Sequence, residues 1–551
     1  MNPVANSRSL TDNEVLEIAA GSSKVNDWIA DHPVTRTTPS YDKAKDEHTV
    51  WYVAKGKDGK EVTEAQVFIT DQTGEIREVR TGPQVAWMMA RGYEGSFGRA
   101  VNRPSIWLTL SALFLIPLIS IRRLVSWRTL DLLVLLSFGF SLIWFNRGEI
   151  FTSVPLAYPP MAYLALRLAW VGYTRGRPPR EAPLEPVSPR PAPRRPAFTG
   201  WSPTWVLVTA LALALALRYG LNAFNSNVID VGYAGVIGAD RISHGMTPYG
   251  TFPSDCGNCD TYGPLTYMAY VPFELAQPWT GRWDALPAAH GAATTFDLLC
   301  VAGMLMLGWR LGGIRLGAAL ALAWAAFPFT AYALESNSND SLVPAMLIWG
   351  LFFAAKPVLR GASVGLAVAA KFGAAILLPL WLRHPFARGG GRRGAVRYIG
   401  GLGIAAALTG WVLLLDGADG VTKFWSRTIG YQLDRESPFS IWGQYPGLHV
   451  VQLGLTALFA VLAVSMLRWP RRLDLLSLTA LSGLLMIGTQ LTLTHWFYLY
   501  IPWFLPFVLV ALVPRWPAPS ARLRTPASEP DAPPRRRHEL PYPAAPVAGG
   551  V

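Results

Sequence analysis

Apolar runs about as long as a membrane is thick recur along this sequence. A helix needs roughly 17–25 apolar residues to cross a hydrocarbon core, and runs of that length alternate with short basic loops from Ser105 onward. Hydrophobic residues make up 51% of the 551 residues and charged residues only 15%, well below the roughly 25% of soluble domains. Because lipid offers no partners to an exposed backbone, such runs fold as helices. The sequence therefore predicts an all-α polytopic membrane protein.

The order of these runs divides the chain into parts. We predict about 11 transmembrane helices and a broken hairpin, whose break lies at Lys371 in the middle of an apolar run. The predicted parts are a small soluble α+β domain (1–103), a three-span unit (104–172), a Pro/Arg-rich linker (173–203), a larger helical membrane domain (204–514) and a disordered basic tail (515–551).

The first hundred residues have the composition of a soluble domain. Apolar spacing predicts a helix within Leu10–Ile29, with Thr11 as its cap. Alternating stretches predict strands at 49–54, 65–70 and 75–80, the first two joined by a hairpin at Asp58-Gly59. The pattern WYVAKG…VFITDQTGEIREVRTG resembles a PepSY-like module. The alternative is a small cap without chemistry of its own.

Basic residues set the expected orientation. Arg-rich loops, the linker and the tail are expected in the cytoplasm, since positive charge is retained there. Loops 222–278, 335–340 and 416–447 then fall outside the plasma membrane, as does the domain 1–103. The net charge of +13 is spread over these loops and tails, which excludes a nucleic-acid-binding domain and favours contact with membrane lipids.

The three outer loops carry the polar side chains that chemistry requires. Asp230 lies in the first loop, and Arg427 and Arg435 lie in the third. A carboxylate can remove a proton from an attacking hydroxyl, and arginine can hold phosphate oxygens. The candidate substrate-binding residues are Tyr233, Tyr249, Tyr262, Glu335, Asn337, Asn339, Asp340, Arg427, Arg435 and His495.

The first outer loop also carries a family resemblance. Its motifs are Asp230-x-x-Tyr233, Gly245-x-x-Pro248-Tyr249 and Tyr262-Gly263-Pro264-Leu265. Together they resemble GT-C membrane glycosyltransferases, closest to the actinobacterial branch that uses polyprenyl-phosphate mannose. The resemblance covers about Thr204 to Val513. It implies a helical bundle, Asp230 as the catalytic base, a sugar on polyprenyl phosphate as donor and a lipid- or polymer-linked glycan as acceptor.

Three departures from that family pattern stand out. The second outer loop has ESNSND at 335–340 where the family commonly has Gly-Gln-x-x-Asn, and Lys371-Phe372 stands where it commonly has Lys-Pro. Residues 250–261, which include Cys256 and Cys259, look like an insertion. The assignment of Asp230 survives these differences, whereas the identity of the sugar and of the acceptor does not follow.

Each candidate residue has a structural alternative. Asp230 could cap the helix that follows it, the two arginines could anchor a segment at the lipid headgroups, and His495 could be an ordinary interface histidine. The 335–340 loop could be a helix-capping turn. Cys256 and Cys259 are predicted to form a disulfide. Two cysteines with Asp255 and Asp260 are weak evidence for a metal, so no metal ligand is assigned, although a divalent cofactor stays open.

These observations predict an inverting GT-C type glycosyltransferase. It would move a hexosyl (mannose-like) or pentosyl group from a polyprenyl-phosphate donor to a glycan or lipid acceptor on the extracytoplasmic face. No P-loop or dinucleotide fingerprint occurs, which argues against an ATP-driven pump or a nucleotide-sugar enzyme. The alternatives are a lipid or sugar transporter or flippase, and a non-catalytic membrane sensor.

Overall fold

The computed structural model describes residues 8–56, 59–92, 98–175, 195–383, 391–433, 435, 437–470 and 473–517. These residues are mostly helical, with one small antiparallel sheet near the N-terminus, as the sequence predicts. Most of the predicted linker (173–203) and basic tail (515–551), and Asp58 of the predicted hairpin, lie outside the described residues.

The N-terminal domain consists of two helices and a four-stranded sheet. Its elements are α1 (Asp12–Ala20), α2 (Ser23–Asp31), β1 (Arg36–Asp42), β2 (Glu47–Lys55), β3 (Glu61–Thr70) and β4 (Ile76–Thr81), with strand order β1-β2-β3-β4. Thr11 caps α1 in a reciprocal capping box with Glu14. Val15, Val25, Val50 and Val67 belong to one buried cluster, so the helices and the sheet share a core.

Two details of this domain differ from the prediction. The single helix predicted within Leu10–Ile29 is interrupted at Gly21 and Ser22, where α1 ends and α2 begins. The sequence also did not indicate β1, which contains Pro39. Proline cannot donate to a sheet ladder and is confined to edge strands, and β1 is an edge of this sheet.

The membrane part follows the predicted apolar runs, although several runs are interrupted. Its principal helices are α4 (Pro104–Leu115), α5 (Trp127–Asn146), α6 (Ile150–Leu156), α7 (Tyr158–Arg175), α8 (Thr204–Asn225), α9 (Asp230–Ser243), α12 (Pro287–Gly312), α13 (Ile314–Ala325), α14 (Pro328–Glu335), α15 (Leu342–Phe352), α16 (Pro357–Ala370), α17 (Leu378–Arg383), α18 (Gly391–Gly410), α22 (His449–Ser465), α23 (Leu475–Thr492) and α24 (Ile501–Leu512).

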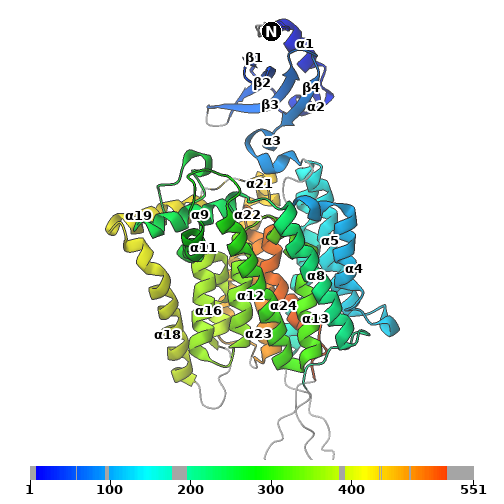
Figure 1. Ribbon diagram of the computed structural model, residues 1–551, viewed down its shortest axis with the longest axis vertical. Helices are drawn as coiled ribbons and strands as arrows, with labels where there is room; N and C mark the ends of the chain where they lie inside the picture. Colours follow the sequence, from blue (N-terminus) through cyan, green and yellow to red (C-terminus); the bar gives the residue numbers. More distant parts are fainter. Residues whose placement is uncertain are drawn as a thin grey trace, which may run out of the picture. The chain divides into compact units, whose positions relative to one another are not determined.

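Shorter elements connect these helices. They are α3 (Pro83–Ala86), η1 (Met88–Arg91), η2 (Arg99–Asn102), η3 (Ile121–Arg123), η4 (Ser254–Cys256), α10 (Pro264–Met268), α11 (Val271–Ala276), η5 (Asn339–Ser341), η6 (Phe372–Leu377), η7 (Trp411–Leu414), α19 (Ala418–Trp425), η8 (Ser426–Gly430), α20 (Tyr431–Leu433), α21 (Ile441–Gln444), η9 (Pro446–Leu448) and η10 (Tyr498–Tyr500). Neighbouring helices of the membrane part lie side by side, namely α8 with α13, α12 with α13, and α16 with α18 (Figure 1).

Fewer helices meet the requirements of a full span than the predicted count of about 11. Within the described residues, 6 helices are long and apolar enough to cross a membrane, or up to 7 if α13 and α14 form one span bent by 56°. The predicted spans that correspond to α4 and α24 are apolar helices of 10–17 residues, as is α16 in the predicted broken hairpin. Proline explains part of the difference, since Pro155 and Pro328 stand at or next to breaks between helices.

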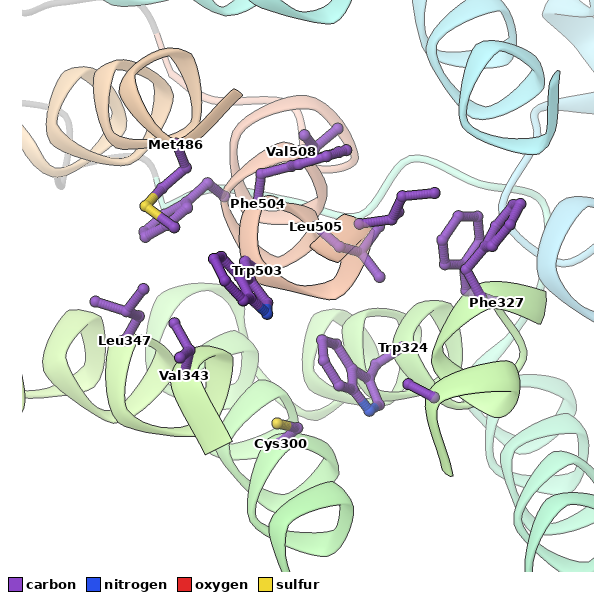
Figure 2. Close-up of a cluster of buried hydrophobic side chains, with 14 of the residues drawn as sticks. Cys300, Trp324, Phe327, Val343, Leu347, Met486, Trp503, Phe504, Leu505 and Val508 are labelled. Carbon is purple, nitrogen blue, oxygen red and sulfur yellow. The ribbon is translucent and has the colours of Figure 1, made fainter. Parts of the chain in front are cut away.

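Some apolar helices are surrounded by other parts of the protein, whereas others expose apolar side chains on the surface. All residues of α24 from Ile501 to Ala511 are buried, and Figure 2 shows Trp503, Phe504 and Val508 packed against residues of α13, α15 and α23. By contrast, α22 exposes Val450, Val461 and other apolar side chains. A helix that is apolar all round belongs to the interior of a bundle, whereas an exposed apolar face of this length fits contact with lipid.

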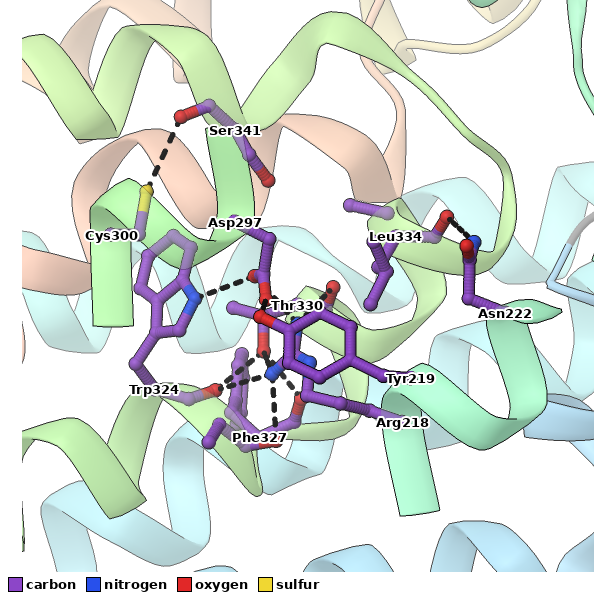
Figure 3. A network of polar contacts seen from close by, with 12 residues as sticks. Arg218, Tyr219, Asn222, Asp297, Cys300, Trp324, Phe327, Thr330, Leu334 and Ser341 are labelled. Atoms are coloured by element: carbon purple, nitrogen blue, oxygen red, sulfur yellow. Dashed lines mark hydrogen bonds and ion pairs between the residues drawn. The ribbon is translucent and has the colours of Figure 1, made fainter. Parts of the chain in front are cut away.

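A buried polar network supports the bend between α13 and α14 (Figure 3). The break before Pro328 frees the carbonyls of Trp324 and Ala325, and Arg218 of α8 donates to both. The Arg218 guanidinium also pairs with Asp297 of α12 at 2.7 Å. Because both charged side chains are fully buried and hydrogen-bonded, they satisfy one another and the broken helix.

Candidate active site

The chain places Asp230 at the start of a helix on the edge of a cavity. After α8 ends, residues 226–229 have no regular secondary structure, with Ser226 and Ile229 extended, and α9 begins at Asp230. One carboxylate oxygen accepts a hydrogen bond from the Val231 N–H at 2.9 Å. The Asp230 side chain therefore binds a backbone N–H in the first turn of α9. It is nevertheless exposed, because it lines a cavity of about 460 Å³.

The loop 335–340 forms the support behind Asp230. The Asn337 side chain donates to the Asn227 carbonyl at 2.9 Å, and the Ile229 N–H donates to the Ser336 carbonyl at 3.2 Å. The two backbones approach so closely that a Cβ on Gly232 would lie 2.3 Å from the Asn337 oxygen. Asn339 donates to the Val231 carbonyl at 3.2 Å. The loop thereby fixes the position of Asp230.

A buried ion pair lies on the same cavity. The helix that begins at Pro357 ends at Ala370, and Lys371 is extended before η6 begins. The sequence predicts this break. The Lys371 ammonium lies 2.6 Å from Asp340, whose carboxylate also accepts from the Trp503 indole at 3.1 Å. The second oxygen of Asp340 is buried and has no hydrogen-bond partner among the described residues.

Arg435 and His495 complete the polar side of the cavity. Both line it together with Asp230, Asp340 and Lys371. The Nε of Arg435 is buried without a hydrogen-bond partner in the part of the chain that is described. Such a donor is costly to leave unpaired, so it favours an anionic ligand. His495 shares a 2.8 Å hydrogen bond with the Ser437 hydroxyl through Nδ1.

A second, smaller cavity adjoins the first. Its volume is about 330 Å³. Five residues line both cavities, namely Tyr262, Lys371, Arg435, His495 and Tyr500. Asp230 lines only the larger cavity, whereas the smaller one extends to Phe372 and Trp503. The two cations therefore stand at the junction, with Asp230 on one side of them.

The protein environment tunes the acid–base groups of the larger cavity. Asp230 is open to the cavity, but the protein around the cavity desolvates its carboxylate and raises its pKa, while the Val231 N–H, Arg435 and Lys371 partly offset that rise. Burial lowers the pKa of His495 well below its ordinary value, and the charges of Arg435 and Lys371 lower it further. His495 is therefore neutral at pH 7, whereas Asp230 is a stronger base than an ordinary aspartate.

Other predicted site residues lie outside the cavity. Tyr233 donates to Asp255 at 3.3 Å, and Tyr249 donates to the Tyr262 carbonyl at 3.0 Å. Glu335 is buried at the end of α14, and neither of its carboxylate oxygens has a hydrogen-bond partner within the described residues. Of the predicted substrate-binding residues, the cavity lining includes Tyr262, Asp340, Arg435 and His495.

Arg427 is engaged elsewhere. Its guanidinium contacts both oxygens of the buried Asp260 at 2.6–2.9 Å and also donates to the Gly257 carbonyl. It lines neither cavity. The pair ties the loop 416–447 to the loop 222–278, which leaves Arg435 as the arginine that lines the cavity among the described residues.

We expect Arg427→Ala to destabilise the protein without abolishing activity. Removal of the guanidinium leaves the fully buried Asp260 carboxylate unpaired, which should lower the free energy of unfolding by about 1.5–3 kcal/mol. Thermal unfolding in detergent would measure the loss. Arg435→Ala is the matched variant and should show the reverse, near-native stability with strongly reduced activity. A stable but inactive Arg427→Ala protein would contradict this assignment.

The predicted disulfide is present, and it lines the cavity. Cys256 and Cys259 are bonded, with Cα atoms 5.3 Å apart. Residues 255–259 all line the larger cavity. Among the described residues, no group of three or more His, Cys, Asp or Glu side chains could hold a metal ion.

Sequence reasoning missed several residues of the site. Lys371 was identified only as the break in a hairpin, although a lysine inside an apolar run is itself a signal of function. Tyr500 and Trp503 belong to an aromatic stretch typical of any membrane interface. The segment 86–89, which also lines the larger cavity, carried no sequence signal.

One family model matches part of this chain. The family model of glycosyltransferase family 87 matches residues 261–494, which is less than half of the chain. The matched region includes Tyr262, Asp340, Lys371 and Arg435, whereas Asp230 and His495 fall outside it. A search of curated proteins finds no match. The family match and the apolar helices together indicate that this chain is a membrane glycosyltransferase.

Proposed function

We propose that the protein transfers a mannose-like sugar from a polyprenyl-phosphate donor to a glycan or lipid acceptor on the extracytoplasmic face of the plasma membrane. The observation that carries this proposal is the arrangement of the larger cavity. An exposed carboxylate, Asp230, shares it with Arg435, whose Nε has no hydrogen-bond partner in the described structure. The carboxylate of Asp230 can accept a proton, and the guanidinium of Arg435 can bind a phosphate.

The proposed reaction is a single displacement. The acceptor hydroxyl attacks the anomeric carbon of the donor while its proton passes to Asp230. The bond between that carbon and the phosphate oxygen breaks, and the phosphate leaves with the electron pair. Arg435 and Lys371 stabilise the charge that develops on the leaving phosphate. Since attack and departure take place on opposite faces of the sugar, the anomeric configuration inverts.

The positions of Asp230, Arg435 and Lys371 support these separate roles in proton transfer and phosphate binding. The two cations lie at the junction with the smaller cavity, and Asp230 lies on the other side of them. The donor phosphate would therefore occupy the junction, and the acceptor hydroxyl would approach through the larger cavity. His495, being neutral, would serve as a hydrogen-bonding group rather than as a cation.

The transporter alternative receives less support. The polar residues that motivated it are Lys371, Asp297 and Gln490. Each has partners within the protein: Lys371 pairs with Asp340, Asp297 with Arg218, and Gln490 both donates to the Tyr500 carbonyl and accepts from the Trp496 indole. These contacts explain Asp297 and Gln490 as structural groups, whereas Lys371 lines both cavities and belongs to the proposed site.

A transfer assay tests the proposal. Purified protein in lipid nanodiscs would receive radiolabelled polyprenyl-phosphate mannose and native membrane lipid extract. The expected result is label in a new product with inverted anomeric configuration. Movement of intact donor between leaflets of proteoliposomes, without any new product, would instead identify a flippase.

The pH dependence of transfer is expected to report Asp230. The base must be ionised, so the rate should fall as the pH drops through the pKa of Asp230, which lies above the ordinary aspartate value. Arg435→Met removes a charge that lowers this pKa, so the acid limb of the rate profile should move to higher pH. His495→Gln should leave the limb in place, because the imidazole is already neutral. A limb that moves with His495→Gln but not with Arg435→Met would contradict this account.

A further inference from the structure

A segment from the N-terminal part of the chain forms one wall of the larger cavity. Residues 86–89 run from the last residue of α3 into η1, after β4 and before the first apolar helix. All four of them, Ala86, Trp87, Met88 and Met89, line the cavity that contains Asp230. This segment lies far outside the region that matches glycosyltransferase family 87, so it is a feature that the family match does not account for.

The segment is held in place from two sides. The Gln84 amide donates to the Gly148 carbonyl at 3.1 Å, and its oxygen accepts from the Lys24 ammonium at 2.7 Å. Arg91 donates to the Gln84 carbonyl at 2.9 Å. A Cβ on Gly92 would lie only 1.9 Å from the Gly148 nitrogen, so the two backbones are in direct contact. The segment is therefore anchored before and after residues 86–89.

Within this anchored segment, Trp87 is packed against the polar side of the site. Its ring lies 6.0 Å from that of His495 and meets Phe439 edge-on at 5.6 Å. Trp283, which lies shortly before α12 in the chain, lines the same cavity. It stacks on Tyr233 at 4.8 Å and donates to the Val228 carbonyl at 3.1 Å. Two fixed indoles thus share the cavity with Asp230.

We propose that Trp87 and Trp283 form the subsite for the acceptor and that the group bound there is a sugar ring. This rests on the proposed function, in which the acceptor approaches through the larger cavity. Both indoles line that cavity and neither lines the smaller one. A fixed aromatic ring presents a flat apolar surface that suits the C–H face of a sugar, while Asp230 receives the proton of its hydroxyl. Trp87 is a positioning residue that the N-terminal part of the chain supplies to the site.

The test varies donor and acceptor separately. With wild-type protein in nanodiscs, native membrane lipid extract is titrated at saturating labelled polyprenyl-phosphate mannose, and the donor is then titrated at saturating extract. Trp87→Ala should raise the amount of extract needed for half-maximal transfer by about tenfold, with no change in donor half-saturation. Trp87→Phe should restore most of the loss, whereas Trp87→Leu, which is apolar but not aromatic, should not.

Matched controls separate this inference from a loss of folding. Trp205→Ala removes an exposed tryptophan of α8 that lines neither cavity, so it should change neither half-saturation value. Thermal unfolding reports whether each variant is folded. Unchanged extract dependence in folded Trp87→Ala and Trp283→Ala, equal shifts for donor and extract, or full activity of Trp87→Leu would overturn the acceptor subsite. Absence of transfer by the wild type would overturn the proposed function itself.

Discussion

Replacement of Asp230 by asparagine is expected to reduce the rate of sugar transfer by about 100- to 10,000-fold, the usual contribution of a general base. The amide has nearly the same shape and its oxygen can still accept from the Val231 N–H, so the start of α9 should be preserved. What is lost is the ability to take a proton from the acceptor. The measurement is the initial rate of transfer from labelled polyprenyl-phosphate mannose.

Two comparisons make the Asp230 result interpretable. Asp419→Asn removes an exposed carboxylate of α19 that lines neither cavity, and it should transfer at the wild-type rate. Thermal unfolding should be the same for both variants and the wild type within a few degrees. If Asp230→Asn were folded and fully active, Asp230 would not be the base, and the other two cavity carboxylates, Asp255 and Asp340, would be examined next.

Replacement of Lys371 by methionine is expected to affect both stability and activity. Lys371 and Asp340 are buried, with side chains 8% and 0% exposed. Removal of one member of such a pair typically costs about 3–5 kcal/mol, because the other charge is left unpaired. Transfer should also fall by about 100- to 1,000-fold, the usual effect of removing a group that stabilises developing charge.

The double variant Lys371→Met, Asp340→Asn separates these two effects. Without the buried carboxylate charge, the free energy of unfolding should recover most of the loss, as seen by thermal or denaturant unfolding. Transfer should stay low, because the cation at the junction of the two cavities is still absent. Recovery of transfer along with stability would show that Lys371 only balances Asp340 and takes no part in the reaction.

The apolar pattern predicts the positions of the helices better than it predicts how many of them cross the membrane. Runs such as Leu473–Thr492 correspond closely to α23 (Leu475–Thr492). The pattern cannot distinguish a helix surrounded by lipid from one surrounded by protein, since both are apolar. The fully buried α24 and the bent pair α13 and α14 are of the second kind, and their short lengths account for the smaller number of full spans.

The sequence indicates only part of the candidate site, because it marks single polar residues but does not show which distant residues come together. Asp230, Asp340, Arg435 and His495 stand in or beside the predicted outer loops, where polar residues of a membrane protein attract attention. The pairing of Arg427 with Asp260 joins residues 167 positions apart, and no local pattern indicates it. Trp87 also lies far along the sequence from the other site residues. A tryptophan near an apolar helix is common in membrane proteins, so its sequence position does not indicate a role.

The most direct test of this account measures donor binding and transfer on the same preparations of wild-type protein and Asp230→Asn. Binding of labelled polyprenyl-phosphate mannose should be equal in the two, because in the proposed mechanism Arg435 and Lys371, and not Asp230, hold the donor phosphate. Transfer to native membrane lipid extract should be present in the wild type and reduced at least 100-fold in the variant. Equal transfer by both proteins, or loss of donor binding in Asp230→Asn, would contradict the role of Asp230 as the base.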